Sequence, residues 1–76
     1  MWKQDFVALR VILSENIKSL RQQRGIAQER LGLESGVDRT LVSKIERQIA
    51  NPSLETLTKI AAQLQVTVTE LLTKKE

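Results

Sequence analysis

The residues best suited to chemistry are polar and basic side chains in the middle of the chain. Four of them share one face of an expected helix: Arg39, Thr40, Ser43 and Lys44. These groups can donate hydrogen bonds and attract anions, but they form no pair of nucleophile and general base. The chain has no histidine and no cysteine, which excludes the usual zinc sites, disulfides, thiol nucleophiles and Ser–His relays. We therefore expect a binding protein that is not an enzyme and has no metal and no cofactor.

The charge of the chain is modest and unevenly distributed. Twelve basic residues outnumber nine acidic ones, which gives a net charge of +3. Between residues 16 and 47 seven basic residues face four acidic ones, whereas the three basic and three acidic residues of segment 54–76 cancel. On charge alone, solvated helix faces explain this distribution better than an anionic partner does.

The length of 76 residues fits one domain, residues 1–76. No apolar run approaches the ~20 residues of a membrane span, and the N-terminal segment lacks the long apolar core of a secretory signal. We expect a cytoplasmic protein without membrane contact. No segment is left over for a sensor domain, so no small-molecule effector is expected.

Apolar spacing predicts an all-α fold of five helices. The first helix should run from about Asp5 to Arg24 and end at Gly25, or begin later if Ser14 is its N-cap. The others are expected at 28–35, at 39–47 after an Asp38 N-cap, at 54–64 after Ser53, and from a Thr67–Glu70 capping box through Leu72.

Residues 28–47 form two short helices around a tight turn, which is a helix-turn-helix unit. Gly32 is small where the two helices should approach each other, and Gly36 can adopt the positive φ that the turn needs. The four polar side chains named above face outward. The inward positions are all apolar: Leu31, Val37, Val42 and Ile45.

Three segments carry a resemblance to a known family. They read LRxxRGIAQExL at 20–31, SGVDRTxVSxIER at 35–47 and NPSLxTLxxIA at 51–61. Over residues 16–72 the chain resembles the phage-repressor/Cro family, which is lambda-repressor-like and Xre-type and includes restriction–modification controller proteins. The resemblance implies a compact five-helix domain that regulates transcription as a homodimer on palindromic double-stranded DNA.

The resemblance also implies roles for individual residues, with helix 39–47 in the major groove. Base contacts fall to Arg39, Thr40, Ser43 and Lys44. Phosphate contacts fall to Gln28, Arg47 and Asn51. Alternatively, Arg39 pairs with Asp38 or contacts only phosphate, and Gln28 is plain helix surface. Arg21 and Glu46 should form a half-buried ion pair that ties the first helix to the third.

Three residues depart from the family pattern. Ala27 replaces the usual Ser or Thr cap of the second helix, while Gln48 and Gln65 replace residues that commonly end the third and fourth helices. These two replacements put the usual left-handed helix endings in doubt.

The C-terminal third is apolar enough to supply a dimer interface, which the resemblance places at Val66, Val68 and Leu72. Leu71 is expected in the core, and Phe6 and Val7 could add to the contact. Two rival functions stay open: an antitoxin that mainly neutralises a protein, and a nucleoid-type protein that binds DNA without sequence preference.

Overall fold

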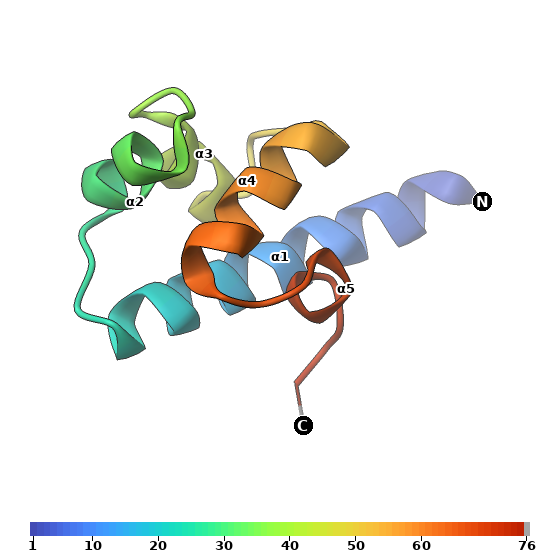
Figure 1. Ribbon diagram of the computed structural model, residues 1–76. Helices are drawn as coiled ribbons and strands as arrows, with labels where there is room; N and C mark the ends of the chain where they lie inside the picture. Colours follow the sequence, from blue (N-terminus) through green and yellow to red (C-terminus); the bar gives the residue numbers. More distant parts are fainter. Residues whose placement is uncertain (76) are drawn as a thin grey trace.

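The computed structural model describes residues 1–75, and these form five α-helices and no strand (Figure 1). The predicted all-α fold is therefore confirmed. Among the described residues, no helix is both long enough and apolar enough to cross a membrane. The helices are α1 (Trp2–Gln23), α2 (Gln28–Ser35), α3 (Leu41–Glu46), α4 (Leu54–Leu64) and α5 (Val68–Leu71).

Helix α1 is longer than its sequence pattern predicts. It begins at Trp2, three residues before Asp5, and its first turns project beyond the other helices (Figure 1). Ser14 does not cap the helix: it is buried inside α1, where its hydroxyl donates to the Val11 carbonyl at 2.8 Å. Hydroxyl groups in helix interiors commonly bond to a preceding carbonyl in this way, so a serine alone does not mark a helix start.

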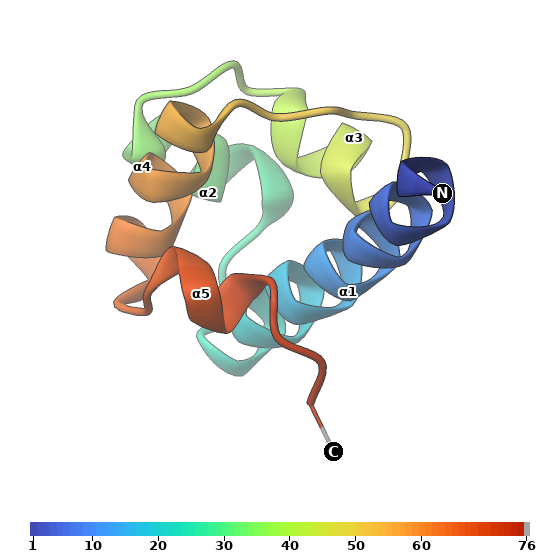
Figure 2. The same ribbon diagram turned by 90° about the vertical axis from the view of Figure 1, so that its right-hand side faces the viewer.

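One core holds the five helices together. Helix α1 packs against α3 and α5, and α2 packs against α3 and α4 (Figure 2). The core residues are all buried and come from every helix: Leu13, Ile17, Leu31, Val42, Ile45, Leu57, Ile60, Ala61, Leu64 and Leu71. Burial of these side chains supplies the main driving force for folding.

Every connection between helices begins with the same backbone motif. After α1, the N–H of Gly25 donates to Gln22 and the N–H of Ile26 donates to Arg21, the pattern of a Schellman motif. The motif recurs after α2, α3 and α4 with Gly36, Gln48 and Gln65 in the left-handed conformation. The left-handed endings of α3 and α4 are thus present although glutamine occupies both positions.

The helix-turn-helix packs as closely as its glycine predicts. A Cβ atom added to Gly32 would lie 3.1 Å from the Asp38 carbonyl oxygen and 3.3 Å from Arg39 Cα. Gly36 ends α2 with a φ of 74°. A side chain at position 32 would therefore push the turn away from α2.

The third helix is shorter than the predicted span 39–47. It runs from Leu41 to Glu46, so Arg39 and Thr40 lie in the turn before it. The prediction of an Asp38 N-cap is wrong, because Thr40 occupies the N-cap position of α3. Asp38 lies two residues earlier, where its carboxylate accepts hydrogen bonds from the backbone N–H and the hydroxyl of Thr40 at 2.8 and 2.6 Å. The Leu41 N–H bonds to the Asp38 carbonyl three residues back, at 3.0 Å, and the four-residue spacing of an α-helix begins only with Lys44 and Thr40. Residues 38–40 therefore form a tight turn before the helix.

The fourth and fifth helices begin as predicted. The Ser53 hydroxyl accepts the N–H of Thr56, and the Thr67–Glu70 capping box is complete. Helix α5 ends at Leu71 instead of continuing through Leu72, which is its C-cap residue.

Candidate nucleic-acid interface

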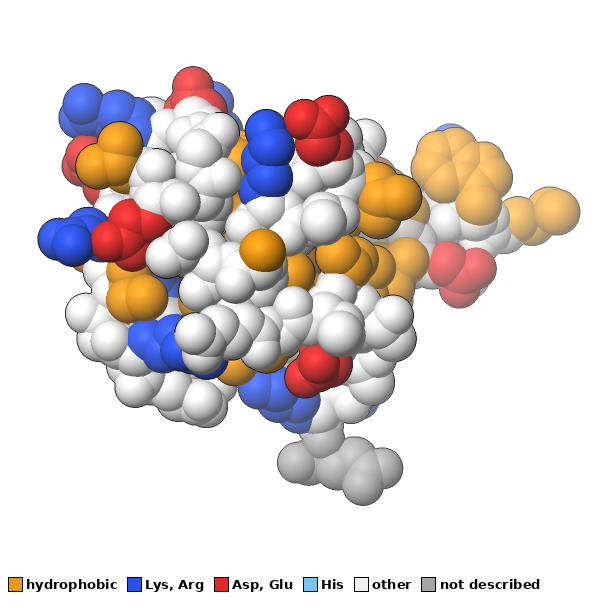
Figure 3. Space-filling view, viewed as in Figure 1, with side chains coloured by type: hydrophobic (Ala, Val, Ile, Leu, Met, Phe, Trp, Pro, Cys, Tyr) orange, Lys and Arg blue, Asp and Glu red, His pale blue; other side chains and the backbone are white. Residues whose placement is uncertain are grey.

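The polar face around the start of α3 is exposed to solvent. Arg39, Thr40 and Lys44 are exposed, and Ser43 is half-buried. Over the α2 side of the molecule, basic side chains lie beside acidic ones (Figure 3). The face therefore offers hydrogen-bond donors and positive charge. The neighbouring carboxylates repel any anion that approaches them closely.

Arg39 pairs with Glu29 of α2 and not with Asp38. Its Nη2 lies 3.2 Å from Glu29 Oε1, and the two side chains are 73% and 70% exposed. Ion pairs at such exposure contribute about 0–1 kcal/mol, so this contact can be exchanged for another at little cost. The Arg39 guanidinium is therefore held only weakly in its present position.

Thr40 is oriented by Asp38. The hydrogen bonds from the Thr40 side chain and backbone lower the pKa of the Asp38 carboxyl, with smaller contributions from Lys44 and Arg39. Because the Thr40 hydroxyl donates to Asp38, its oxygen lone pairs remain free to accept a hydrogen bond. Thr40 thus presents an acceptor at the start of α3.

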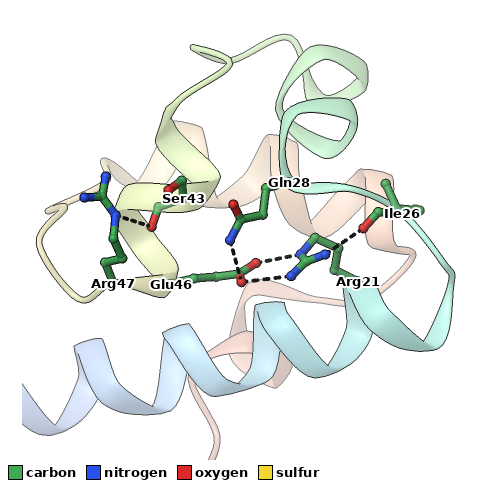
Figure 4. Close-up of polar contacts among 6 residues, drawn as sticks. All are labelled: Arg21, Ile26, Gln28, Ser43, Glu46 and Arg47. Carbon is green, nitrogen blue, oxygen red and sulfur yellow. Dashed lines mark hydrogen bonds and ion pairs between the residues drawn. The ribbon is translucent and has the colours of Figure 1, made fainter.

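Gln28 opens α2 and is half-buried, with its amide turned toward the protein. Its Nε2 donates to Glu46 Oε1 at 2.9 Å (Figure 4). Ala27 caps α2 without a side-chain hydrogen bond. The first backbone N–H groups of α2 therefore have no side-chain acceptor, which is the arrangement that binds phosphate at helix N-termini.

The ion pair expected between Arg21 and Glu46 is present and shielded. Arg21 Nε and Nη2 donate to the two Glu46 oxygens at 2.7 and 3.0 Å, and Nη1 donates to the Ile26 carbonyl at 2.9 Å (Figure 4). The side chains are 13% and 5% exposed. Burial acts to raise the pKa of Glu46, but the hydrogen bonds from Arg21 and Gln28 outweigh it, so the pKa is lowered.

Arg47 and Asn51 lie at the other end of α3. Both are exposed, and the only hydrogen bond of the Arg47 side chain within the described residues joins Nε to the Ser43 carbonyl at 3.4 Å. Figure 4 shows the Arg47 guanidinium directed away from Glu46. The geometry leaves its Nη atoms available to an external anion.

Sequence reasoning missed two contacts of this site, the Gln28–Glu46 hydrogen bond and the Glu29–Arg39 ion pair. Both join α2 to residues of the turn or of α3, at separations of eighteen and ten residues. No helical spacing rule covers such separations, so only the observation that both residues are polar and flank the turn could have suggested them.

The candidate dimer residues lie on a partly apolar surface. Val66, Val68 and Leu72 are half-buried and pack on the core, whereas Leu71 is fully buried, as predicted. Leu72 also lines an apolar groove with Phe6 of α1. Further along this projecting part of α1, hydrophobic side chains are exposed: Trp2, Val7 and Leu9.

Residues 17–71 match the family model HTH_3, described as helix-turn-helix. The control protein C.SmaI from Serratia marcescens is 37% identical over 70 residues, covering 92% of this chain and 83% of that protein. A hypothetical transcription factor from Neisseria meningitidis is 41% identical over 64 residues, and the chain spans 60% of its length.

Two solved structures support the same assignment. The Neisseria transcription factor NHTF superposes with a TM-score of 0.83 at 39% identity, over 87% of this chain and 76% of that one. The restriction–modification controller protein C.AhdI from Aeromonas hydrophila gives 0.76 at 35% identity, over 82% and 94%. The chain belongs to the HTH_3 family of DNA-binding helix-turn-helix transcriptional regulators. Its homologues include controller proteins of restriction–modification systems.

Proposed function

We propose that this protein regulates transcription by binding a palindromic operator as a homodimer, in the cytoplasm and on the nucleoid. The turn residues Arg39 and Thr40 and the first turn of α3 enter the major groove. Arg39, Thr40, Ser43 and Lys44 contact base edges, while Gln28, Arg47 and Asn51 contact phosphates on either side. No small-molecule effector takes part.

One observation carries this proposal: the exposed polar face lies on α3 and on the turn before it, and the opposite side of α3 is fixed. Glu46 at the end of α3 is bonded to Arg21 of α1 and to Gln28 of α2. Base readout needs side chains on a rigid element, because a displacement of one ångström breaks a hydrogen bond. The half-buried ion pair supplies that rigidity in the free protein.

Gln28 can contact phosphate without giving up this role. Its Nε2 is committed to Glu46, so the phosphate is bound by the backbone N–H groups of the first turn of α2 and by the remaining amide hydrogen of Gln28. The interaction would place α2 across the DNA backbone, which is how the first helix of such a unit is oriented.

The dimer supplies the second half of the readout. A single recognition helix reads few base pairs, so selectivity needs two copies on half-sites about 34 Å apart. The half-buried residues Val68 and Leu72 offer an apolar surface next to α5, and two-fold symmetry is the commonest way to pair such surfaces.

Selection of bound duplexes from a random DNA pool tests the proposal. One enriched palindrome is the expected result. Enrichment of a single asymmetric half-site would contradict the dimer, and no enrichment at all would favour binding without sequence preference.

The selected duplex then allows a matched comparison. The affinities for this duplex and for a scrambled one are measured for the wild-type protein, for Arg39→Ala and for Lys59→Ala. The comparison distinguishes the loss of a base contact from a general loss of positive charge. Lys59 belongs to α4 and, among residues 1–75, forms an ion pair with Glu55 alone, so it serves as the control for removing one positive charge.

A further inference from the structure

Asn16 is a buried polar residue of α1 that plays no part in the DNA-facing site. It is 4% exposed. Its Nδ2 donates to the carbonyl oxygens of Leu71 at 2.8 Å, Thr73 at 2.9 Å and Glu70 at 3.3 Å. One amide group thus binds three backbone carbonyls around the end of α5, 54 to 57 residues away in the sequence.

Helix α5 needs this support because it has only four residues. A helix so short cannot persist on its own in water. The Thr67–Glu70 capping box closes its N-terminal end. At the C-terminal end, the Val68 and Thr69 carbonyls accept hydrogen bonds from the Leu72 N–H and the Thr73 hydroxyl. The carbonyls that need a further donor are those of Glu70 and Leu71. The N–H of Thr73 reaches the Glu70 carbonyl only at 3.4 Å. Asn16 supplies the donors that the end of α5 lacks.

The same helix that carries Asn16 also holds the recognition helix. Arg21, five residues further along α1, binds Glu46 of α3 through two hydrogen bonds. At about 1.5 Å per residue, the two attachment points lie roughly 7.5 Å apart along the α1 axis. Helices α3 and α5 are therefore held in a fixed relation through one rigid element.

We propose that Asn16 is a positioning residue that sets the distance and rotation between the two recognition helices of the homodimer. It thereby sets the half-site spacing that the protein selects. This inference rests on the proposed function, in which Leu72 forms part of the dimer contact. Leu72 lies directly between Leu71 and Thr73, whose carbonyls Asn16 holds, so a loosened end of α5 would loosen the dimer geometry.

Half-site spacing is a sensitive readout of this geometry. One base pair added between half-sites shifts one of them by about 3.4 Å and rotates it by about 35°. A rigid dimer cannot follow this change, whereas a dimer with a loosely attached α5 can. The variant should therefore tolerate wrong spacings without gaining or losing base contacts.

The test measures binding of the full chain to the selected palindrome, to versions with one base pair inserted or deleted at its centre, and to a single half-site. For the wild type, we expect each altered spacing to lower affinity at least about tenfold. Asn16→Ala should reduce this penalty to less than about threefold, while its half-site affinity stays unchanged. Asn16→Asp keeps the shape but loses the amide donor, and should behave like Asn16→Ala.

Ile60→Val is the matched control for a simple loss of stability. Ile60 is fully buried in α4 and carries no hydrogen-bonding group. All variants are compared at temperatures at which circular dichroism shows them folded. Should Asn16→Ala fail to fold, Asn16→Gln replaces it: the amide is retained one methylene further from α1, and the spacing profile should broaden as well.

A folded Asn16→Ala or Asn16→Gln that keeps the wild-type spacing profile would overturn the inference and leave the proposed function intact. A broadened profile in Ile60→Val would also overturn it, because stability alone would then explain the effect. Failure of the wild type to select any palindrome would instead refute the proposed function.

Discussion

The guanidinium of Arg21 and the carboxylate of Glu46 are joined by two hydrogen bonds of 2.7 and 3.0 Å. The pair links α1 to the last residue of α3, and both side chains are largely shielded from solvent. A shielded pair of this kind resists the loss of either partner, because the remaining charge would be left without compensation.

Glu46→Gln should therefore destabilise the protein at neutral pH, by about 3 kcal/mol. It should also flatten the dependence of stability on pH. The pKa of Glu46 is lowered below its ordinary value of 4.5 in the folded protein. The stabilisation is thus present above that value and is lost as the pH falls through the lowered pKa. Urea unfolding between pH 7 and pH 3 measures both effects.

Glu55→Gln is the control for this prediction. Glu55 pairs with Lys59 on the exposed face of α4, so its loss should change stability by less than about 1 kcal/mol. Equal effects of the two substitutions would show that the Arg21–Glu46 pair contributes no more than a surface contact.

Arg39→Ala should selectively abolish the preference for the operator. A well-placed arginine contributes about 1–3 kcal/mol of discrimination between bases. The ratio of affinities for operator and scrambled duplex, measured at equal salt, should fall accordingly. Equal weakening on both duplexes would assign Arg39 to a phosphate.

Arg47→Ala should weaken binding to both duplexes by a similar factor. The loss of one phosphate contact should reduce the slope of log affinity against log salt by about 1. Lys59→Ala should leave this slope unchanged.

Gln28→Ala should also weaken binding to both duplexes. In addition, it should lower the free energy of unfolding by about 1 kcal/mol, because the hydrogen bond to Glu46 is lost.

Gln65→Gly should stabilise the protein. Gln65 has a φ of 60° at the end of α4, and the left-handed conformation costs about 1–2 kcal/mol for a residue with a side chain. Part of the gain is offset by the greater freedom of glycine in the unfolded chain, which leaves about 1 kcal/mol or an increase in Tm of roughly 4–8 °C. A thermal melt that shows no increase would contradict this account of the helix ending.

Leu72→Glu should give a folded monomer that no longer binds the palindrome tightly. Sedimentation measures the mass, and circular dichroism monitors folding. A variant that stays folded and dimeric would exclude Leu72 from the interface.

The sequence predicts three of the five described helices, α2, α4 and α5, to within one residue, because their apolar spacing and their end signals agree. The start of α3 could not be predicted in this way, since an aspartate that bonds to the N–H two residues on can open either a helix or a tight turn. Here residues 38–40 form a turn, and α-helical bonding begins at Thr40. Ser14 presents the same ambiguity, because its hydroxyl bonds equally well inside a helix.

The candidate site divides along the same line. The outward position of Ser43 and Lys44 follows from helical periodicity, and the Arg21–Glu46 pair follows from family resemblance. Arg39 and Thr40 lie in the turn before α3, which helical periodicity does not describe. The contact of Asn16 with α5 follows from neither, because it joins segments 54 to 57 residues apart through backbone carbonyls, which every residue carries.

The four Schellman motifs give every joint between the described helices the same main-chain hydrogen bonds. Each turn is fixed by main-chain hydrogen bonds, and even glutamine is accepted where glycine is cheaper. The loop residues beyond these turns, such as Ile49 and Asn51, can therefore be substituted without changing the orientation of the helices that they connect. Substitutions on the surface of such a scaffold can change which DNA sequence it binds, while the arrangement of its helices stays the same.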